Sequence, residues 1–337
     1  MSQTILVTGG AGFIGANFIP YFMEKHPTYK IINLDKLTYA GNLDNLKEVE
    51  NNPNYTFIKG DICDENFINS LFDKYTITGV IHFAAESHVD NSISGPRAFI
   101  NTNILGTFNL LEACRTHWYD APFTPKPECK DYRFHHISTD EVFGTLGDTG
   151  FFCETTPYAP NSPYSASKAS SDFLVRAYHH TFGLNTTISN CSNNYGPKQH
   201  GEKLIPTIIR NCLNQSPIPI YGNGKNIRDW LYVTDHAKAI DIIYHNGVLG
   251  QTYNVGGHNE LTNLDITHTI CEILDNERPR PDGKKYKELI TFVKDRAGHD
   301  KRYAIDPTKI ETSLSYKPDE TFTTGIVKTV RWYLNKQ

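Results

Sequence analysis

A glycine-rich turn near the start of the chain constrains the fold more than any other sequence feature. An apolar run at residues 4 to 8 leads into this turn, and helix-like periodicity follows over residues 13 to 22. The turn offers two glycine registers, G-x-G-x-x-G at Gly10, Gly12 and Gly15 and a wider spacing at Gly9, Gly12 and Gly15. Glycines let the backbone approach a pyrophosphate, which free N–H groups and the helix dipole attract to a helix N-terminus. The pattern therefore predicts a dinucleotide-binding strand, turn and helix.

A second apolar run supplies the acid that such a site uses. Residues 30 to 35 end in Asp35, which lies 20 residues after Gly15. A carboxylate in this place accepts hydrogen bonds from the ribose hydroxyls and repels a 2′-phosphate. The spacing therefore favours NAD over NADP as cofactor, although the adjacent Lys36 weakens that preference.

Strands and helices continue to alternate through the N-terminal half of the chain. We expect further strands at residues 55 to 59, 79 to 85 and 134 to 138, and a helix at residues 99 to 114. This order predicts an α/β fold with a Rossmann-type, doubly wound parallel sheet. Two strand ends can contact the cofactor, through Asp61 and Ile62 after the third strand and through the small Ala84 and Ala85 at the end of the fourth.

The fifth strand ends in a hydroxyl and two adjacent carboxyls, at Thr139, Asp140 and Glu141. An acidic pair alone is typical of a solvated turn. At the carboxyl edge of an open α/β sheet, where ligands bind, the same pair indicates acid/base chemistry. Thr8 and Ser138, in contrast, are expected to satisfy backbone groups.

A tyrosine and a lysine follow on the next predicted helix, which runs from Tyr164 to about Phe182. Tyr164 and Lys168 are four residues apart and therefore share a helical face. A free tyrosine has a pKa near ~10, and a neighbouring ammonium together with a positive nicotinamide would lower it. The pair thus predicts a phenolate base that takes a sugar hydroxyl proton while hydride leaves the same carbon.

Composition narrows the partners. With 337 residues, of which 39% are hydrophobic, the chain can bury a large core, and we expect two domains. They are a dinucleotide-binding domain at residues 1 to 190, with returning segments at about 229 to 257, and a smaller C-terminal α/β substrate-binding domain at residues 191 to 337. A net charge of −4 gives no field for nucleic acid or an anionic membrane, so a small-molecule partner is expected.

The cysteines and the N-terminal residues indicate a compartment. Seven widely spaced cysteines without a Cys-x-x-Cys pair predict reduced thiols, and neither a metal site nor a disulfide framework. The first residues carry no basic and long apolar segment of the secretory kind. We therefore expect a cytoplasmic protein.

The glycine turn with Tyr164 and Lys168 resembles the extended short-chain dehydrogenases that act on nucleotide sugars. Within that group the chain is similar to the dTDP-glucose 4,6-dehydratase family, through HISTDEVFG at 136 to 144, AAESHVD at 84 to 90, NCSNNYGP at 190 to 197, EKLIP at 202 to 206, RDWLYV at 228 to 233 and GHDKRY at 298 to 303. The resemblance covers nearly the whole chain. It departs at Asn190, where the family commonly has Arg, and at Phe143, where it commonly has Tyr.

The resemblance implies dehydration of dTDP-glucose, with oxidation at C4, loss of water across C5 and C6, and hydride return to C6. Tyr164, tuned by Lys168 and aided by Thr139, would take the C4 hydroxyl proton. Glu141 would then remove the C5 proton, and Asp140 would protonate the leaving C6 hydroxyl. The product, a 4-keto-6-deoxy sugar, would feed rhamnose-type deoxysugar synthesis.

The resemblance also implies binding residues and a homodimer. Substrate would contact Ser87, Thr139, Asn193, Lys203, Leu204, Pro219, Tyr221, Arg228, Asn263 and His299. NAD would contact Gly9, Gly12, Phe13, Ile14, Gly15, Asp35, Lys36, Asp61, Ile62, Ala84, Ala85, Thr102, Tyr164, Lys168 and Asn194. We expect a helix at residues 202 to 213, and subunits that pair through the helices at about 99 to 114 and 164 to 182.

Two other functions stay open. A UDP-sugar 4-epimerase or decarboxylase would keep the Tyr/Lys pair but would have no use for Asp140 and Glu141 as an acid/base pair. A non-catalytic NAD-sensing protein could use the same fold, because fold does not fix function. Intact catalytic side chains argue against that second alternative.

Overall fold

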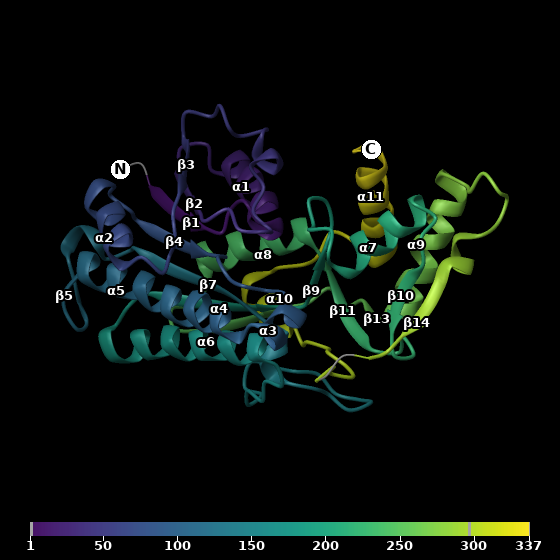
Figure 1. Cartoon of the computed structure of the whole chain (residues 1–337). Coiled ribbons are helices and arrows are strands. Elements are labelled where there is room, and N and C mark those ends of the chain that lie inside the picture. Colours follow the sequence, from purple (N-terminus) through teal and green to yellow (C-terminus); the bar gives the residue numbers. More distant parts are fainter. Residues whose placement is uncertain (1–2, 296–297, 337) are drawn as a thin grey trace.

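A computed structural model describes residues 3–295 and 298–336, and its centre is a seven-stranded parallel sheet (Figure 1). The strand order is β12-β8-β7-β4-β1-β2-β3. The strands are β1 (Thr4–Thr8), β2 (Lys30–Asp35), β3 (Tyr55–Lys59), β4 (Gly79–His82), β7 (Arg133–Thr139), β8 (Thr186–Cys191) and β12 (Thr252–Val255). The order reverses at β1, as in Rossmann folds, so the predicted fold class is confirmed.

Helices cover both faces of this sheet. The elements α1 (Phe13–Lys25) and α8 (Val233–Asn246) pack on one face, and α2 (Glu65–Lys74), α5 (Thr107–Trp118) and α6 (Pro163–Phe182) pack on the other. Successive residues of β1 point to opposite faces, since Ile5 and Val7 join the α1/α8 core while Leu6 joins the α2/α5/α6 core. Both faces are buried, which explains why the strands read as continuous apolar runs.

Strand β4 ends three residues earlier than predicted, at His82 instead of Ala85. The following residues leave the sheet to pack against the glycine turn, where a Cβ added at Gly9 would lie 2.6 Å from the Ala84 nitrogen. The predicted helix at 99 to 114 is also modified. It consists of α4 (Pro96–Phe99), a π-helical segment η2 (Ile100–Gly106) and α5. π-helical turns are frequent at functional sites, and Thr102 of η2 faces the cavity described below.

The C-terminal part forms a second core beside the sheet, at the right of Figure 1. It contains the three-stranded sheet β13-β11-β9 and the pair β10-β14. These strands are β9 (Asn193–Tyr195), β10 (Ile218–Tyr221), β11 (Ile227–Tyr232), β13 (Glu260–Thr262) and β14 (Ile290–Val293), and the helices packed on them are α7 (Leu204–Leu213), α9 (Asn263–Glu277) and α11 (Phe322–Asn335). Helix α7 begins two residues later than predicted, with Lys203 as its N-cap.

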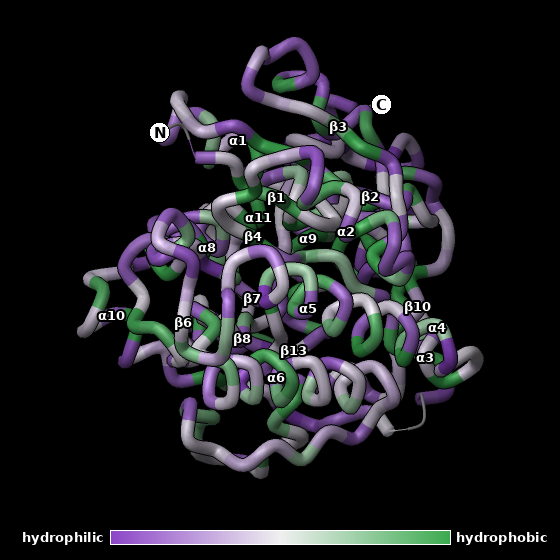
Figure 2. Tube along the Cα trace, turned by 90° about the vertical axis from the view of Figure 1, so that its left-hand side faces the viewer, coloured by the Kyte–Doolittle hydropathy of each residue, from purple (hydrophilic) through white to green (hydrophobic). Residues whose placement is uncertain are grey.

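The remaining elements are short. They are α3 (Val89–Ser94), α10 (Thr308–Leu314), the hairpin of β5 (Tyr119–Ala121) and β6 (Thr124–Pro125), and the 3-10 turns η1 (Leu43–Leu46), η3 (Pro127–Cys129), η4 (Asp140–Phe143) and η5 (Tyr286–Leu289). Figure 2 shows hydrophobic segments gathered in the strands and inner helices, with hydrophilic segments in the outer loops. Within the described ranges, no helix is long and apolar enough to span a membrane.

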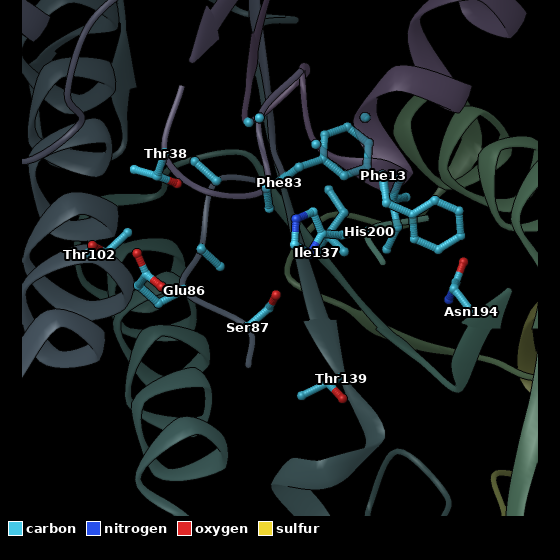
Figure 3. A pocket seen from close by; sticks show the side chains of 18 of the residues that line it. Phe13, Thr38, Phe83, Glu86, Ser87, Thr102, Ile137, Thr139, Asn194 and His200 are labelled. Carbon is cyan, nitrogen blue, oxygen red and sulfur yellow. The ribbon is translucent and has the colours of Figure 1, made fainter. Parts of the chain in front are cut away.

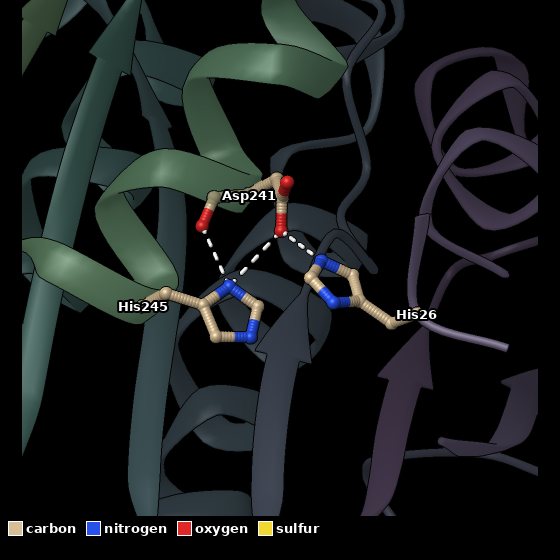
Figure 4. A group of neighbouring side chains, drawn as sticks. All are labelled: His26, Asp241 and His245. Atoms are coloured by element: carbon tan, nitrogen blue, oxygen red, sulfur yellow. Dashed lines mark hydrogen bonds and ion pairs between the residues drawn. The ribbon is translucent and has the colours of Figure 1, made fainter. Parts of the chain in front are cut away.

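A cluster of three polar side chains ties the end of α1 to α8 (Figure 4). Asp241 Oδ1 lies 2.7 Å from His26 Nε2 and 3.0 Å from His245 Nδ1. The three ligand-type atoms lie within 4.8 Å of one another, close enough to hold a metal ion. However, His245 Nδ1 also lies 2.9 Å from the Asp241 carbonyl oxygen, and its Nε2 lies 3.3 Å from the Tyr29 hydroxyl. Because both ring nitrogens of His245 have hydrogen-bonding partners, we interpret the cluster as a hydrogen-bonded latch.

This latch predicts a pH-dependent contribution to stability. Although burial opposes it, the hydrogen bonds from His245 and His26 lower the pKa of Asp241. A lowered folded-state pKa stabilises the protein above the unfolded pKa, and the stabilisation is lost as pH falls through the folded pKa. We expect Asp241→Asn to reduce the free energy of unfolding by about 2 kcal/mol at pH 7, with a difference that shrinks below pH ~4.

The measurement is urea unfolding of both proteins across this pH range. Asp319→Asn is the matched control, because Asp319 pairs with Lys238 at 2.8 Å on an exposed surface. It should cost less than about 1 kcal/mol. Equal effects of the two substitutions at pH 7 would contradict the latch.

Candidate active site

One cavity of about 320 Å³ opens at the carboxyl edge of the parallel sheet, between the glycine turn and the ends of β4 and β7 (Figure 3). Ile137 and Thr139 enter it from β7, Phe13 from the start of α1 and Asn194 from β9. All five predicted catalytic residues line it, namely Thr139, Asp140, Glu141, Tyr164 and Lys168. The fold therefore gathers residues that lie far apart in the sequence into one site.

The glycine turn distinguishes between the two possible registers. Gly9, Gly12 and Gly15 line the cavity, and Gly9 has a φ of +73°, which favours glycine. Gly10 does not line the cavity. A Cβ added at Gly10 would lie 2.2 Å from Asn33 Oδ1, so this residue packs on β2 beneath the turn. Within the described residues no side chain caps the first turn of α1 and no acid lies in it. The amide groups at this end suit an anion.

The residues predicted for the adenosine end also come together. Asp35 lines the cavity and accepts hydrogen bonds from the amides of Ala11 at 2.9 Å and Leu37 at 2.8 Å. Lys36, which weakened the preference for NAD, points to Asp61 at 2.7 Å. The Lys36 ammonium is therefore paired with a carboxylate beside Asp35. Every residue predicted to contact NAD lines this cavity.

Thr139, Asp140 and Glu141 occupy the turn η4, where the strand passes into a 3-10 helix. The Thr139 side chain accepts a hydrogen bond from the Glu141 amide and donates one to Asp140 Oδ1, both at 3.3 Å. Asp140 is only 1% exposed, and among the described atoms its Oδ2 has no hydrogen-bond partner. Burial, together with the charges of Glu141 and Asp229, raises its pKa well above the usual value. Burial therefore favours the protonated form of Asp140.

Tyr164 and Lys168 lie on the first turns of α6. Ser162 and Ser165 form a capping box there, and Pro163 occupies the first helical position, which fixes the start of the helix. Burial and the Glu141 charge raise the pKa of Tyr164, so the predicted lowering is absent from the protein alone. Burial lowers the pKa of Lys168 to about 8. The phenol therefore needs further positive charge beside it before it can act as a base.

Beneath these residues lies a layer of buried polar side chains. Ser138 donates to Asp172 Oδ2 at 2.8 Å, so the expectation that it satisfies a backbone group is wrong. Thr8 accepts a hydrogen bond from the Ala84 amide at 3.4 Å, as predicted, and its hydroxyl also lies 2.7 Å from His82 Nδ1. Side-chain partners in neighbouring elements, which sequence periodicity does not reveal, complete both groups.

The predicted substrate residues divide into two groups. Ser87, Thr139, Asn193 and Lys203 line the cavity. The others lie outside its described lining, at Leu204, Pro219, Tyr221, Arg228, Asn263 and His299. The rings of Tyr221 and His299 nevertheless meet edge to face, with centroids 6.4 Å apart.

Arg228 lies outside the cavity but acts on it electrostatically. Its guanidinium stacks on Tyr303 at 4.1 Å and donates to the Asp300 carbonyl at 2.9 Å. Its charge opposes the rise in the pKa of Asp140, so the two groups lie near each other. A buried arginine near a buried acid can also attract an anionic ligand.

Several lining residues were not predicted. They include Thr38, Gly41, Phe83, Glu86, Cys191, Gln199, His200 and Glu202. The last three belong to a loop between β9 and α7, and Lys203 at its end donates to the Ser87 carbonyl at 3.1 Å. Polar residues in an irregular loop carry no periodic signal, and only the contact across the cavity reveals them.

The chain is similar to known proteins along nearly its full length. The family model described as GDP-mannose 4,6 dehydratase matches residues 6–329. A dTDP-glucose 4,6-dehydratase from Xanthomonas campestris pv. campestris (strain B100) is 53% identical over 334 residues, which cover 99% of this chain and 94% of that protein. One from Neisseria meningitidis serogroup B (strain ATCC BAA-335 / MC58) is 54% identical over 338 residues, with 99% and 94% covered.

Solved structures of the same enzyme resemble the chain in fold. The dTDP-glucose 4,6-dehydratase from Bacillus anthracis str. Ames, in complex with NAD, has a TM-score of 0.86 and 43% identity, with 99% of this chain and 97% of that chain covered. The enzyme from Streptomyces venezuelae, also with NAD bound, has a TM-score of 0.89 and 41% identity over the same shares. The UDP-glucose 4-epimerase of Thermotoga maritima shares the fold at 25% identity, with a TM-score of 0.86 and 99% of each chain covered. Its cavity holds an acid pair, a tyrosine and a lysine beside a dinucleotide-type glycine turn, and two relatives are 53% and 54% identical over nearly the whole chain. The chain therefore belongs to the dTDP-glucose 4,6-dehydratase family.

Proposed function

We propose that this protein is an NAD-dependent hydro-lyase that converts dTDP-glucose to dTDP-4-keto-6-deoxyglucose in deoxysugar biosynthesis. One observation carries the proposal, which is that the buried Asp140, its neighbour Glu141 and the pair Tyr164 and Lys168 face a single cavity. A base, an acid and a phenol together match a reaction that combines oxidation with elimination.

NAD fits the residues that line the cavity. The uncapped end of α1 suits the pyrophosphate, and Asp35 suits the adenosine ribose. When bound, NAD would accept the C4 hydride and return it to C6 after the elimination, while a proton is added at C5, and in its oxidised form it would place a positive charge beside the phenol. That positive charge would lower the pKa of Tyr164, which burial raises in the protein alone.

In the first step Tyr164 takes the proton of the C4 hydroxyl, and Thr139 donates a hydrogen bond to the same oxygen. Lys168 supports the phenolate from the next helical turn, with its Nζ fixed 2.7 Å from the Ile137 carbonyl oxygen. A ketone at C4 then acidifies the C5 proton. This step uses the buried, raised-pKa phenol only while positive charge is nearby.

In the second step Glu141 removes the C5 proton and Asp140 protonates the departing C6 hydroxyl. Successive side chains of a 3-10 helix are rotated by about 120°, so the two carboxyls at the start of η4 point in different directions and can address neighbouring carbons. Because the pKa of Asp140 is raised, its carboxyl can keep the proton that it donates, whereas an ordinary exposed aspartate would have lost it at neutral pH.

The alternatives fit the site less well. A UDP-sugar 4-epimerase or decarboxylase would need the tyrosine and lysine but gives no role to a buried, protonated Asp140 beside Glu141. A non-catalytic NAD-sensing protein would need neither pair. Burial of Asp140 beside another acid costs stability, and a role in proton transfer accounts for keeping it there, which favours the dehydratase.

We further propose the arrangement of the chain around this reaction. Residues 1–190, with returning segments at about 229–257, bind NAD, and residues 191–337 bind the nucleotide sugar through Lys203, Tyr221, Arg228 and His299. All seven cysteines are free thiols, which supports a cytoplasmic location.

A homodimer is the second part of this arrangement. Helices α3, η2, α5 and α6 lie side by side and expose large apolar side chains, at Ile93, Ile100, Leu105, Phe108 and Phe173. A contiguous apolar surface of this kind supports pairing with a second copy. Sedimentation equilibrium tests it, because a single species of monomer mass would exclude the pairing.

Incubation of the purified protein with dTDP-glucose in D₂O tests the proposed reaction. We expect loss of one water, seen by mass spectrometry, and one deuterium at C5, seen by NMR, because the C5 proton exchanges during elimination. An unchanged sugar mass without deuterium would exclude the reaction and direct the search to UDP-sugars.

Substitution of the acid pair tests the roles of its members. Asp140→Asn and Glu141→Gln should each lower kcat for dehydration by about 10²- to 10⁴-fold, because each removes a proton-transfer group. Both variants should still bind NAD, which calorimetry measures. Near-normal dehydration by either variant would contradict its role.

Cofactor preference tests Asp35. Asp35→Asn removes the charge that repels a 2′-phosphate, so NAD should bind about tenfold more weakly and its advantage over NADP should narrow. Fluorescence titration with both nucleotides measures this change. An unchanged preference would show that Asp35 only orders the turn through Ala11 and Leu37.

A further inference from the structure

The Lys168 ammonium is almost fully buried, beside a second charge that the proposed mechanism does not use. Lys168 is 4% exposed, and Asp172, one helical turn further along α6, is fully buried. An isolated buried charge is strongly disfavoured, so each ion needs compensation from a neighbour.

His136 lies between the two charged groups. Its Nε2 lies 3.4 Å from Lys168 Nζ and 3.2 Å from Asp172 Oδ1. Ser171 Oγ lies 3.2 Å from the same nitrogen. Burial and the Lys168 charge lower the pKa of His136, so the ring is neutral. Its Nδ1 has no partner among the described atoms, which favours the tautomer whose proton sits on Nε2, because an unpaired N–H costs more than an unpaired lone pair. With its proton on Nε2 the ring accepts no hydrogen bond from Lys168, so the two charges act on each other electrostatically across the ring.

Asp172 is held as an anion by donors on its other side. Its Oδ2 accepts hydrogen bonds from Ser138 at 2.8 Å and from the Tyr158 hydroxyl at 2.9 Å. Asn190, in turn, donates to that hydroxyl at 3.2 Å. Two donated bonds stabilise a carboxylate, which is why a group without solvent can remain ionised.

We infer that Asp172, one helical turn from Lys168 and on the other side of the His136 ring, is the buried counter-charge of the Lys168 ammonium, and is thus a positioning residue for proton removal by Tyr164. The inference rests on the proposed function for its catalytic consequence only. Asp172 touches neither the sugar nor the cofactor cavity, and it acts by keeping the lysine charged.

The charges around the pair support this assignment. Burial raises the pKa of Asp172 to about 6 and lowers that of Lys168 to about 8, so both are ionised between these values. The Asp172 charge opposes the fall for Lys168. The other titratable groups facing the pair are Tyr158, Tyr164, Arg176, Cys191 and the neutral His82. The Arg176 charge lowers the pKa of Asp172, and its guanidinium donates to Thr252 Oγ1 at 3.1 Å.

The test is the titration of Lys168 in the purified protein labelled with ¹³Cε-lysine, where the NMR signal is assigned by its loss in Lys168→Met. Asp172→Asn removes the negative charge, so the ammonium should lose its proton at lower pH. We expect the midpoint to fall by at least about one pH unit, a tenfold change in the acid dissociation constant. Arg176→Gln is the matched control and should leave the midpoint within about twofold.

The pH profile of turnover supplies the second readout. In Asp172→Asn the loss of activity with rising pH should begin at least about one unit lower than in the unmodified protein. If Asp172→Asn does not fold, Tyr158→Phe removes one donor to the carboxylate while it keeps the aromatic contact with Phe143, and it should move both readouts in the same direction by less.

The outcomes separate the two claims. A fixed midpoint, with activity reduced equally at every pH, would overturn the inference and leave Asp172 a structural role. No turnover of dTDP-glucose by the unmodified protein would contradict the proposed function instead, and the NMR titration would still decide whether Asp172 and Lys168 are coupled.

Discussion

The active site depends on one carboxyl group that the fold has removed from water. Asp140 is buried at the end of β7, with Glu141 beside it and one oxygen unpartnered among the described atoms. Ionising both of two neighbouring carboxyls costs much free energy when one is desolvated. Burial therefore favours a protonated Asp140 beside an ionised Glu141. In the proposed mechanism, the acid that donates a proton and the base that accepts one thus arise from one dipeptide in two environments.

The parallel sheet makes this division possible. Its strands deliver their carboxyl ends to one edge, so the glycine turn after β1, Asp35 after β2 and the acid pair after β7 meet around one cavity. Helix α6 then crosses behind β7 and places Tyr164 and Lys168 against the same edge. Beneath this edge, the buried Asp172 carboxylate offsets the positive charge of Lys168.

Local patterns in the sequence were sufficient to predict the dinucleotide half. Strand, glycine turn and terminal acid are close in sequence, and their geometry follows from backbone rules, so the Rossmann-type sheet and the position of Asp35 could be predicted. The early end of β4 could not, because it depends on Ala84 packing against Gly9. Ser138, Asp172 and the loop carrying His200 were equally hidden, since their partners lie on other elements. The raised pKa of Tyr164 also follows from burial, which a helical spacing does not reveal.

The protonation state of Asp140 tests the account most directly. Infrared difference spectra between the unmodified protein and Asp140→Asn, recorded from pH 5 to 9, report whether this carboxyl carries its proton. The account predicts a protonated-carboxyl band that persists at neutral pH and is absent from the variant. A carboxylate band alone at neutral pH would contradict it, because an ionised Asp140 has no proton to give to the leaving hydroxyl.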